Sequence, residues 1–143
     1  MTTVKSSSMP IFKKLNLGDH AEIAVFNAPQ SFEMELARLK SVKVLRDPKK
    51  PKAITFGIAF AAAQTELDRV SAIFAAASTG DAVLWFAYPK GTSKRYKCDF
   101  NRDTGWQVIR DAGFESVRQV AIDEDWSALR FRRLEYVKRD GKT

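Results

Sequence analysis

The chain has 143 residues, of which 45% are hydrophobic, and it carries a formal net charge of +7. This length fits one domain with one core, and the hydrophobic share excludes wholesale disorder. No apolar run is long and uncharged enough to span a bilayer, and the start of the chain lacks the apolar run of a signal peptide, so we expect a cytoplasmic protein with no membrane partner.

Cysteine and histidine are too scarce for several kinds of site. Cys98 and His20 are the only residues of their types, so no internal disulfide can form and a structural zinc site lacks ligands. A magnesium site built from carboxylates stays open as an alternative. Apart from it, we predict no metal and no cofactor.

The chain divides into a flexible segment over residues 1–10, a single α/β domain over 11–137 and a polar tail over 138–143. At the start of the domain, Ile11–Gly18 has helical spacing and a closing glycine, and we expect it to cover one end of the core. The run 46–52 contains two prolines and three lysines and predicts a solvated turn.

Short apolar or alternating runs predict the strands, which we place at 21–26, 42–45, 53–60, 81–88, 115–123 and 128–136. In the last of them, Leu129 and Phe131 alternate with Arg130 and Arg132, which is typical of an edge strand or a half-exposed strand. Such a strand can also pair with a second copy of the chain, which leaves a homo-oligomer open.

Helical periodicity predicts helices over 31–39, 65–78 and 105–112. Ser31 is the expected N-cap of the first helix. Thr65 with Asp68, and Thr104 with Gln107, have the spacing of capping pairs for the other two.

This order of elements predicts a small three-layer α/β/α domain of Rossmann-like topology, with a mainly parallel sheet and a C-terminal antiparallel hairpin. The hairpin order is similar to the end of class I methyltransferases, an analogy of fold alone. In such sheets, ligands bind outside the carboxyl ends of the strands.

The first strand ends in Asn27-Ala28-Pro29 and lacks both G-x-G-x-x-G and the P-loop pattern. Ala28 and Pro29 obstruct the close backbone approach that a pyrophosphate needs, which disfavours NAD, P-loop nucleotides and S-adenosylmethionine. Candidate ligand residues at this rim are Asn27, Asp123 and Trp126. Each has a plainer alternative: a bond within its own turn, an ordinary acidic hairpin turn, and core packing, respectively.

The loop from Lys90 to Arg102 is basic and contains Tyr96 and Phe100, a mixture that suits phosphates or single-stranded nucleic acid. Lys90, Lys94 and Arg102 are our candidates for anion binding, supported by a helix N-terminus expected near Thr104. The alternative is a solvated loop whose aromatic residues cover the end of the sheet.

Cys98 follows Lys97, and a neighbouring cation would lower the pKa of its thiol. A catalytic cysteine normally needs a base, and nothing in the sequence brings His20 close to it. No G-x-S-x-G elbow is present either, so we predict no catalytic residue.

Three stretches, VFNAPQSF (25–32), LWFAYPKGTSK (84–94) and DEDWSALRFRR (123–133), together resemble a small bacterial family of unknown function. That family has an Asn-Ala-Pro strand end and an Asp-x-x-Trp-Ser-Ala-Leu-Arg-Phe ending, and the resemblance covers most of residues 11–133. It implies a cytosolic bacterial domain of about this length and no established activity. The loop from Lys90 to Arg102 is more basic than the family pattern.

Together these observations favour a non-catalytic binding or regulatory module. The alternatives are an enzyme acting on a small anionic, phosphorylated substrate with Asp123 as base, and a weak nucleic-acid-binding protein. The expected partner is a small anionic ligand; nucleic acid is the less favoured partner, because a basic balance is also common without one.

Overall fold

The computed structural model describes residues 11–46 and 53–141, with side chains described through residue 137. The segment predicted to be flexible, residues 1–10, and nearly all of the turn predicted over 46–52 lie outside these ranges. The predicted polar tail, residues 138–143, is described only as backbone through residue 141, where it is helical.

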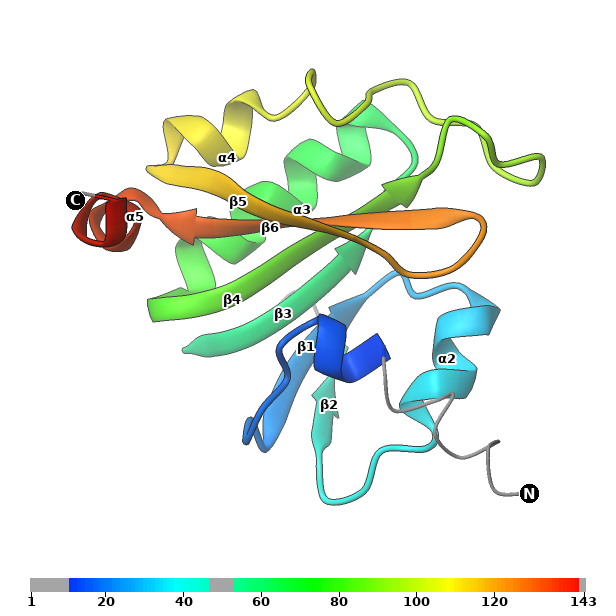
Figure 1. Cartoon of the computed structure of the whole chain (residues 1–143), viewed down its shortest axis with the longest axis horizontal. Helices are drawn as coiled ribbons and strands as arrows, with labels where there is room; N and C mark the ends of the chain where they lie inside the picture. The colour runs from blue at the N-terminus through cyan, green and yellow to red at the C-terminus, as the bar shows by residue number, and fades with distance from the viewer. Residues whose placement is uncertain (1–10, 47–52, 142–143) are drawn as a thin grey trace.

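The described residues form one six-stranded mixed sheet (Figure 1). Its strands, in the spatial order β2-β1-β3-β4-β6-β5, are β1 (Glu22–Phe26), β2 (Lys43–Leu45), β3 (Ile54–Phe60), β4 (Ser78–Pro89), β5 (Phe114–Ala121) and β6 (Trp126–Arg133). The pairs β1–β2, β1–β3 and β3–β4 are parallel, whereas β6 runs antiparallel to both β4 and β5. The predicted α/β class, mainly parallel sheet and C-terminal antiparallel hairpin are therefore confirmed.

Helices cover both faces of the sheet, as Figure 1 shows. The labelled helices are α2 (Gln30–Leu36), α3 (Gln64–Ala77), α4 (Gln107–Asp111) and α5 (Leu134–Gly141). One core cluster contains the buried residues of α3 and α4, and a second contains those of α2 and of the segment 11–17. The sheet is the middle layer between these two clusters.

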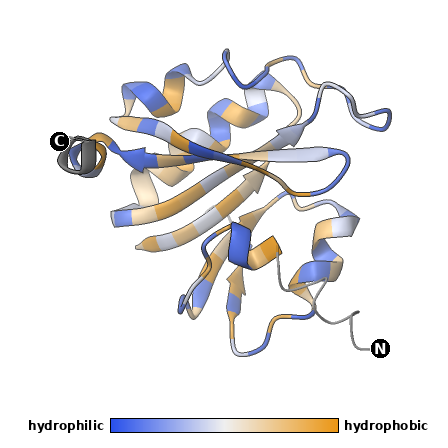
Figure 2. Ribbon diagram, in the orientation of Figure 1, coloured by the Kyte–Doolittle hydropathy of each residue, from blue (hydrophilic) through white to orange (hydrophobic). Residues whose placement is uncertain are grey.

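Strand β4 contributes buried side chains to both core clusters. Leu84 and Phe86 belong to the α3/α4 cluster, whereas Val83 and Trp85 belong to the α2 cluster. Successive side chains of a strand point to opposite faces, so a continuous apolar run fits a strand that is covered on both sides. In Figure 2 the hydrophobic residues are concentrated in the strands, and the loops at the sheet ends are more hydrophilic.

The segment 11–17 is part of the core and not only a cover over its end. Residues 11–14 form one helical turn, and Leu15 is completely buried. The indole Nε1 of Trp85 donates a hydrogen bond of 2.8 Å to the backbone oxygen of Leu15. This bond satisfies two buried polar groups at once and holds the segment against the middle of the sheet.

All three predicted side-chain caps are wrong. Helix α2 begins after Pro29, and no side chain caps it. Helix α3 begins after Ala63, and the first backbone N–H, that of Gln64, donates to Asp99 Oδ1 at 2.7 Å. A carboxylate that lies 35 positions away in the sequence therefore takes the place of a local cap.

At α4, the N-cap residue is Trp106, again without a side-chain cap bond. The hydroxyl of Thr104, expected to cap this helix, instead donates to Asn101 Oδ1 at 3.3 Å. The short loop before α4 folds back on itself, so its polar side chains bond within the loop.

The last strand is shorter than predicted and is not at the edge. Strand β6 lies between β4 and β5, so the edge alternative for its alternating pattern is wrong, and its arginines are partly buried while Leu129 and Phe131 are buried. It ends at Arg133, opposite Phe114, the first residue of β5. Beyond that point the strand has no partner, and Leu134 begins α5.

Replacing Gly57 with alanine is expected to lower the free energy of unfolding by about 1–3 kcal/mol. A Cβ atom at this position would lie 2.8 Å from Cζ of Phe74. Phe74 is fully buried between the rings of Phe26 and Phe86, so it has little room to move. Urea denaturation measures the effect, with Gly91→Ala as the control because its new Cβ meets no atom within 4 Å. Equal stability of the two variants would contradict this packing.

Candidate ligand-binding site

The loop between β4 and α4 is fixed at its first half by one serine and one aspartate. Ser93 Oγ accepts hydrogen bonds from the backbone N–H groups of Arg95 and Tyr96, and it donates to Asp125 Oδ1 at 2.9 Å. The backbone N–H of Lys90 donates to the backbone oxygen of Asp125 at 2.8 Å. The loop is therefore attached to the turn between β5 and β6.

Its second half is attached to the helices. Asn101 Oδ1 accepts from the backbone N–H groups of Asp103 and Thr104, and the indole of Trp106 donates to the backbone oxygen of Asn101. Asp99 caps α3 as described above, and its own N–H donates to the backbone oxygen of Ala62 at 3.3 Å. These bonds give a long, polar loop a defined path across the carboxyl ends of β3 and β4.

A cavity of about 760 Å³ lies under this loop. It is lined by Tyr88, Pro89, Lys90, Gly91, Thr92, Ser93, Tyr96, Lys97, Cys98, Phe100, Asn101, Arg102, Gln119 and Ser127. We call it the β4-loop cavity. Its lining contains residues of β4, the loop, β5 and β6, which all meet at the carboxyl end of β4.

Two of the three predicted anion-binding residues share this cavity. Lys90 follows the end of β4 and Arg102 lies near the end of the loop, and both contribute to its lining, as does Lys97. Lys94 does not: it lines a neighbouring cavity of about 460 Å³ together with Arg95, residues of the β5–β6 turn and Thr92, which lines both cavities.

Hydrogen bonds connect Arg102 to the floor of the β4-loop cavity. The guanidinium of Arg102 donates to Gln119 Oε1 at 3.4 Å, and Gln119 Nε2 donates to the Tyr88 hydroxyl at 2.9 Å. Burial raises the pKa of Tyr88, and the charge of Arg102 opposes this only in part. Tyr88 therefore stays a neutral phenol at neutral pH.

The thiol of Cys98 is also kept protonated. Burial raises its pKa, and a hydrogen bond from the backbone of Phe100 offsets this only partly. The predicted lowering of the Cys98 pKa is therefore wrong, because burial disfavours the charged thiolate and is the largest cause of the shift. His20, the other candidate for such chemistry, bonds Thr55 Oγ1 near the amino end of β3, away from this cavity.

None of the three rim candidates lines the β4-loop cavity. Asn27 has a positive φ of 61°, so it makes the sharp turn for which glycine is common, and its amide donates to the backbone oxygen of Phe60. Trp126 is buried against the rings of Phe60 and Tyr96. Trp126 therefore has the packing role that the sequence left open, whereas Asn27 bonds the end of β3 and not its own turn.

Asp123 is bound within its own turn and to α2. Its Oδ1 accepts from the N–H groups of Asp125 and Trp126 at 2.8 and 2.9 Å, and its Oδ2 accepts from the hydroxyl of Ser31 at 3.2 Å. Within the described residues, no group of three or more His, Cys, Asp or Glu side chains is placed to hold a metal ion.

Sequence reasoning missed Gln119 and Ser127 as lining residues. A signal for both exists, because they are polar residues at positions where the strand period points toward the α3/α4 cluster. The register pairs Ser127 with Tyr88 and Gln119 with Leu129, both of which belong to that cluster. Ser127 is buried, and a buried polar residue often indicates a site, whereas Gln119 is exposed.

The fold and the cavity define an α/β domain with a Rossmann-like sheet and an opening at the carboxyl ends of its strands. The sequence matches no model of a known protein family, and no curated protein is significantly similar to it. No helix within the described ranges has the length and apolar character needed to cross a membrane.

Solved structures with a similar fold include several methyltransferases. A SAM-dependent methyltransferase from Aquifex aeolicus is 11% identical, with 88% of this chain and 89% of that chain covered and a TM-score of 0.59. The N-methyltransferase NodS from Bradyrhizobium japonicum WM9, in complex with S-adenosylhomocysteine, is 10% identical, with 90% and 86% covered and a TM-score of 0.56.

The cyclase SpnF is likewise 10% identical, with 90% of this chain and 80% of that chain covered and a TM-score of 0.59. At such identities the likeness shows the fold alone. The chain therefore has the Rossmann-like fold that these methyltransferases and this cyclase share.

Proposed function

We propose that this protein is a non-catalytic binding module that takes up a small anionic molecule in the β4-loop cavity. The observation that carries this proposal is the charge of the lining. Among the described residues that line the cavity, Lys90, Lys97 and Arg102 are cations, and none is a carboxylate. A concave surface with charges of one sign attracts the opposite charge.

Neutral donors in the same lining add to the attraction. The hydroxyl groups of Tyr88 and Ser127 and the amide of Gln119 line the cavity beside the cations. Arg102 also pairs with Asp103 at 3.5 Å, but both side chains are exposed, so this pair contributes little. A phosphate or carboxylate of the ligand therefore competes easily with Asp103 for the guanidinium.

The chemistry of the lining favours binding over catalysis. The phenol of Tyr88 and the thiol of Cys98 both have raised pKa values, so neither is a ready nucleophile or base at neutral pH. Histidine is absent from the lining. These features support a module that recognises its ligand without transforming it.

Isothermal titration of the protein with AMP, and with adenosine as the matched neutral compound, tests the proposal. We expect AMP to bind and adenosine to bind at least tenfold more weakly. Arg102→Gln should weaken AMP binding at least tenfold, because it removes a charge-assisted hydrogen bond. Arg118→Gln, on an exposed strand position outside the lining, is the control and should have no effect.

Two further titrations separate the alternatives. Binding of S-adenosylhomocysteine that Arg102→Gln leaves unchanged would overturn the proposal and favour an enzyme related to the methyltransferases of this fold. Binding of single-stranded DNA that falls steeply with salt, without competition from AMP, would instead favour a nucleic-acid-binding protein.

A further inference from the structure

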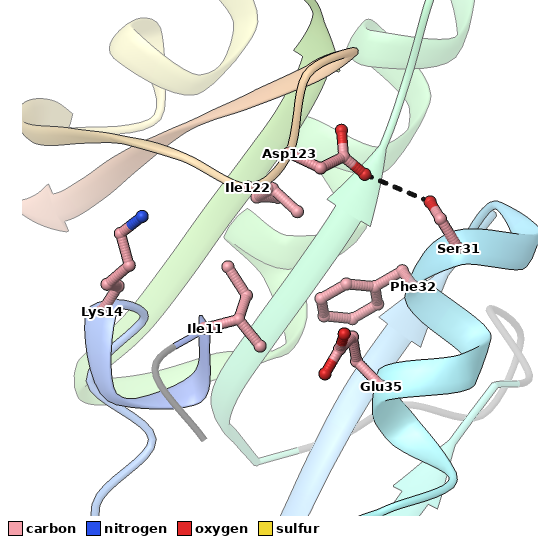
Figure 3. A pocket seen from close by; sticks show the side chains of 7 residues that line it. All are labelled: Ile11, Lys14, Ser31, Phe32, Glu35, Ile122 and Asp123. Carbon is pink, nitrogen blue, oxygen red and sulfur yellow. Dashed lines mark hydrogen bonds between the residues drawn. The ribbon is translucent and has the colours of Figure 1, made fainter. Parts of the chain in front are cut away.

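A second cavity, of about 300 Å³, lies between the helical turn 11–14, helix α2 and the β5–β6 turn (Figure 3). It is lined by Ile11, Lys14, Ser31, Phe32, Glu35, Ile122 and Asp123. It shares no lining residue with the β4-loop cavity, so it is a separate site. We call it the α2 cavity.

Two of the lining side chains are already satisfied by the protein. Figure 3 shows the bond from the Ser31 hydroxyl to Asp123, whose other oxygen accepts two backbone N–H groups of its own turn. A carboxylate with three donors has little need of a further partner. Asp123 and Ser31 therefore close one side of the cavity and fix its shape.

Glu35 differs from them. Its Oε1 atom is buried and has no hydrogen-bond partner among the described residues. Leaving a buried carboxylate oxygen without a donor is costly, and native structures seldom retain such an atom without a reason. Glu35 lies near the end of α2, where the helix dipole does not favour a negative charge. The Oε1 atom of Glu35 can therefore accept a hydrogen bond from a ligand in the cavity.

Lys14 supplies the opposite charge from another element. Its ammonium donates to the backbone oxygen of Ala121 at 3.0 Å, and an ammonium has three donors, so two remain for a ligand. In Figure 3, Lys14 and Glu35 flank the cavity from the helical turn and from α2. Ile11, Phe32 and Ile122 give the space an apolar wall.

We propose that the α2 cavity binds the zwitterion of a free amino acid that has an apolar side chain. The ammonium group of the ligand donates to Glu35, its carboxylate accepts from Lys14, and its side chain packs on the apolar wall. A lining with one available charge of each sign matches such a ligand better than a simple cation or anion. The volume is near the lower limit for ligand pockets, about 300 Å³, which suits a small molecule.

Isothermal titration of the full chain with L-leucine, L-methionine and L-phenylalanine tests this inference, with backbone amide NMR shifts as a readout for millimolar affinities. We expect at least one of them to bind. The best of them should bind at least tenfold more tightly than two analogues that each lack one charge. For leucine these are 3-methylbutylamine, which lacks the carboxylate, and N-acetyl-L-leucine, which lacks the ammonium.

Glu35→Gln and Lys14→Gln should each weaken this binding at least tenfold, because each removes one charge from the cavity. Glu33→Gln on the same helix and Lys13→Gln in the same turn are the matched controls, since neither residue lines the cavity. Circular dichroism and urea denaturation verify that the variants fold.

Three results would overturn the inference: no saturable binding of any of the three amino acids, equal binding of an analogue with one charge, or full binding by the folded Glu35→Gln variant. Arg102→Gln should leave amino-acid binding unchanged. The proposal for the α2 cavity and the proposal for the β4-loop cavity are therefore tested independently of each other.

Discussion

Replacing Phe86 with alanine is expected to lower the free energy of unfolding by about 3–5 kcal/mol. Phe86 is fully buried in β4, and its ring lies 5.5 Å from that of Phe74, 5.9 Å from that of Trp106 and 5.6 Å from that of Phe131, centroid to centroid. The substitution removes apolar surface from the core. It also leaves a cavity that the three neighbouring rings are too rigid to fill. Urea denaturation followed by tryptophan fluorescence measures the loss.

Because such a loss is comparable to the whole stability of many domains, Phe86→Leu is the second variant, with a smaller expected loss. Met34→Ala is the control, since Met34 is an exposed residue of α2, and its effect should stay within about 0.5 kcal/mol. If Phe86→Ala behaves like Met34→Ala, the position of this ring at the centre of the α3/α4 cluster is wrong.

Replacing Asp123 with alanine is expected to lower the free energy of unfolding by about 2 kcal/mol. The substitution removes the acceptor of two partly buried N–H groups in the β5–β6 turn and the acceptor of the Ser31 hydroxyl. The turn loses its fixed shape, and α2 loses a contact with it. Urea denaturation again provides the measurement.

Asp123→Asn separates the two contributions. Asparagine keeps an oxygen for both N–H groups of the turn, so this variant should retain most of the stability. Ser31→Ala removes only the exposed bond and should cost less than about 1 kcal/mol. A loss in Asp123→Asn as large as in Asp123→Ala would show that charge, and not the acceptor geometry, determines the effect.

The mainly parallel sheet was predictable because it depends on local patterns. The apolar runs are short, are ended by residues such as Pro29, and mostly alternate with segments of helical period, which indicates parallel strands with crossover helices. The antiparallel pairing of β5 with β6 followed from the short last connection, whereas the pairing of β6 with β4 was not predictable from it. The fold class could therefore be derived without any long-range contact.

The caps could not be predicted, because their partners are distant in the sequence. Nothing local to Gln64 indicates that Asp99 accepts from its N–H, and nothing local to Ser31 indicates that its hydroxyl reaches Asp123. The raised pKa of Cys98 could not be predicted either. The burial that raises it depends on how the loop folds over the sheet.

The candidate site was partly predictable. The basic loop was recognised from its composition, but only the path of the loop decides that Lys90 and Arg102 line one cavity and Lys94 another. The α2 cavity could not be found from the sequence, because Lys14, Glu35 and Ile122 come from three separated elements. Each of these residues alone has the pattern of an ordinary surface or core position.

The position of β6 also constrains the order in which the protein can fold during synthesis. Strand β5 is joined to the sheet only through β6, which follows it in the chain. Until residues 126–133 have left the ribosome, β4 keeps an unpaired edge and β5 has no place in the sheet. A nascent or truncated chain that stops before β6 would therefore expose an apolar strand edge, which is a template for aggregation and for chaperone binding.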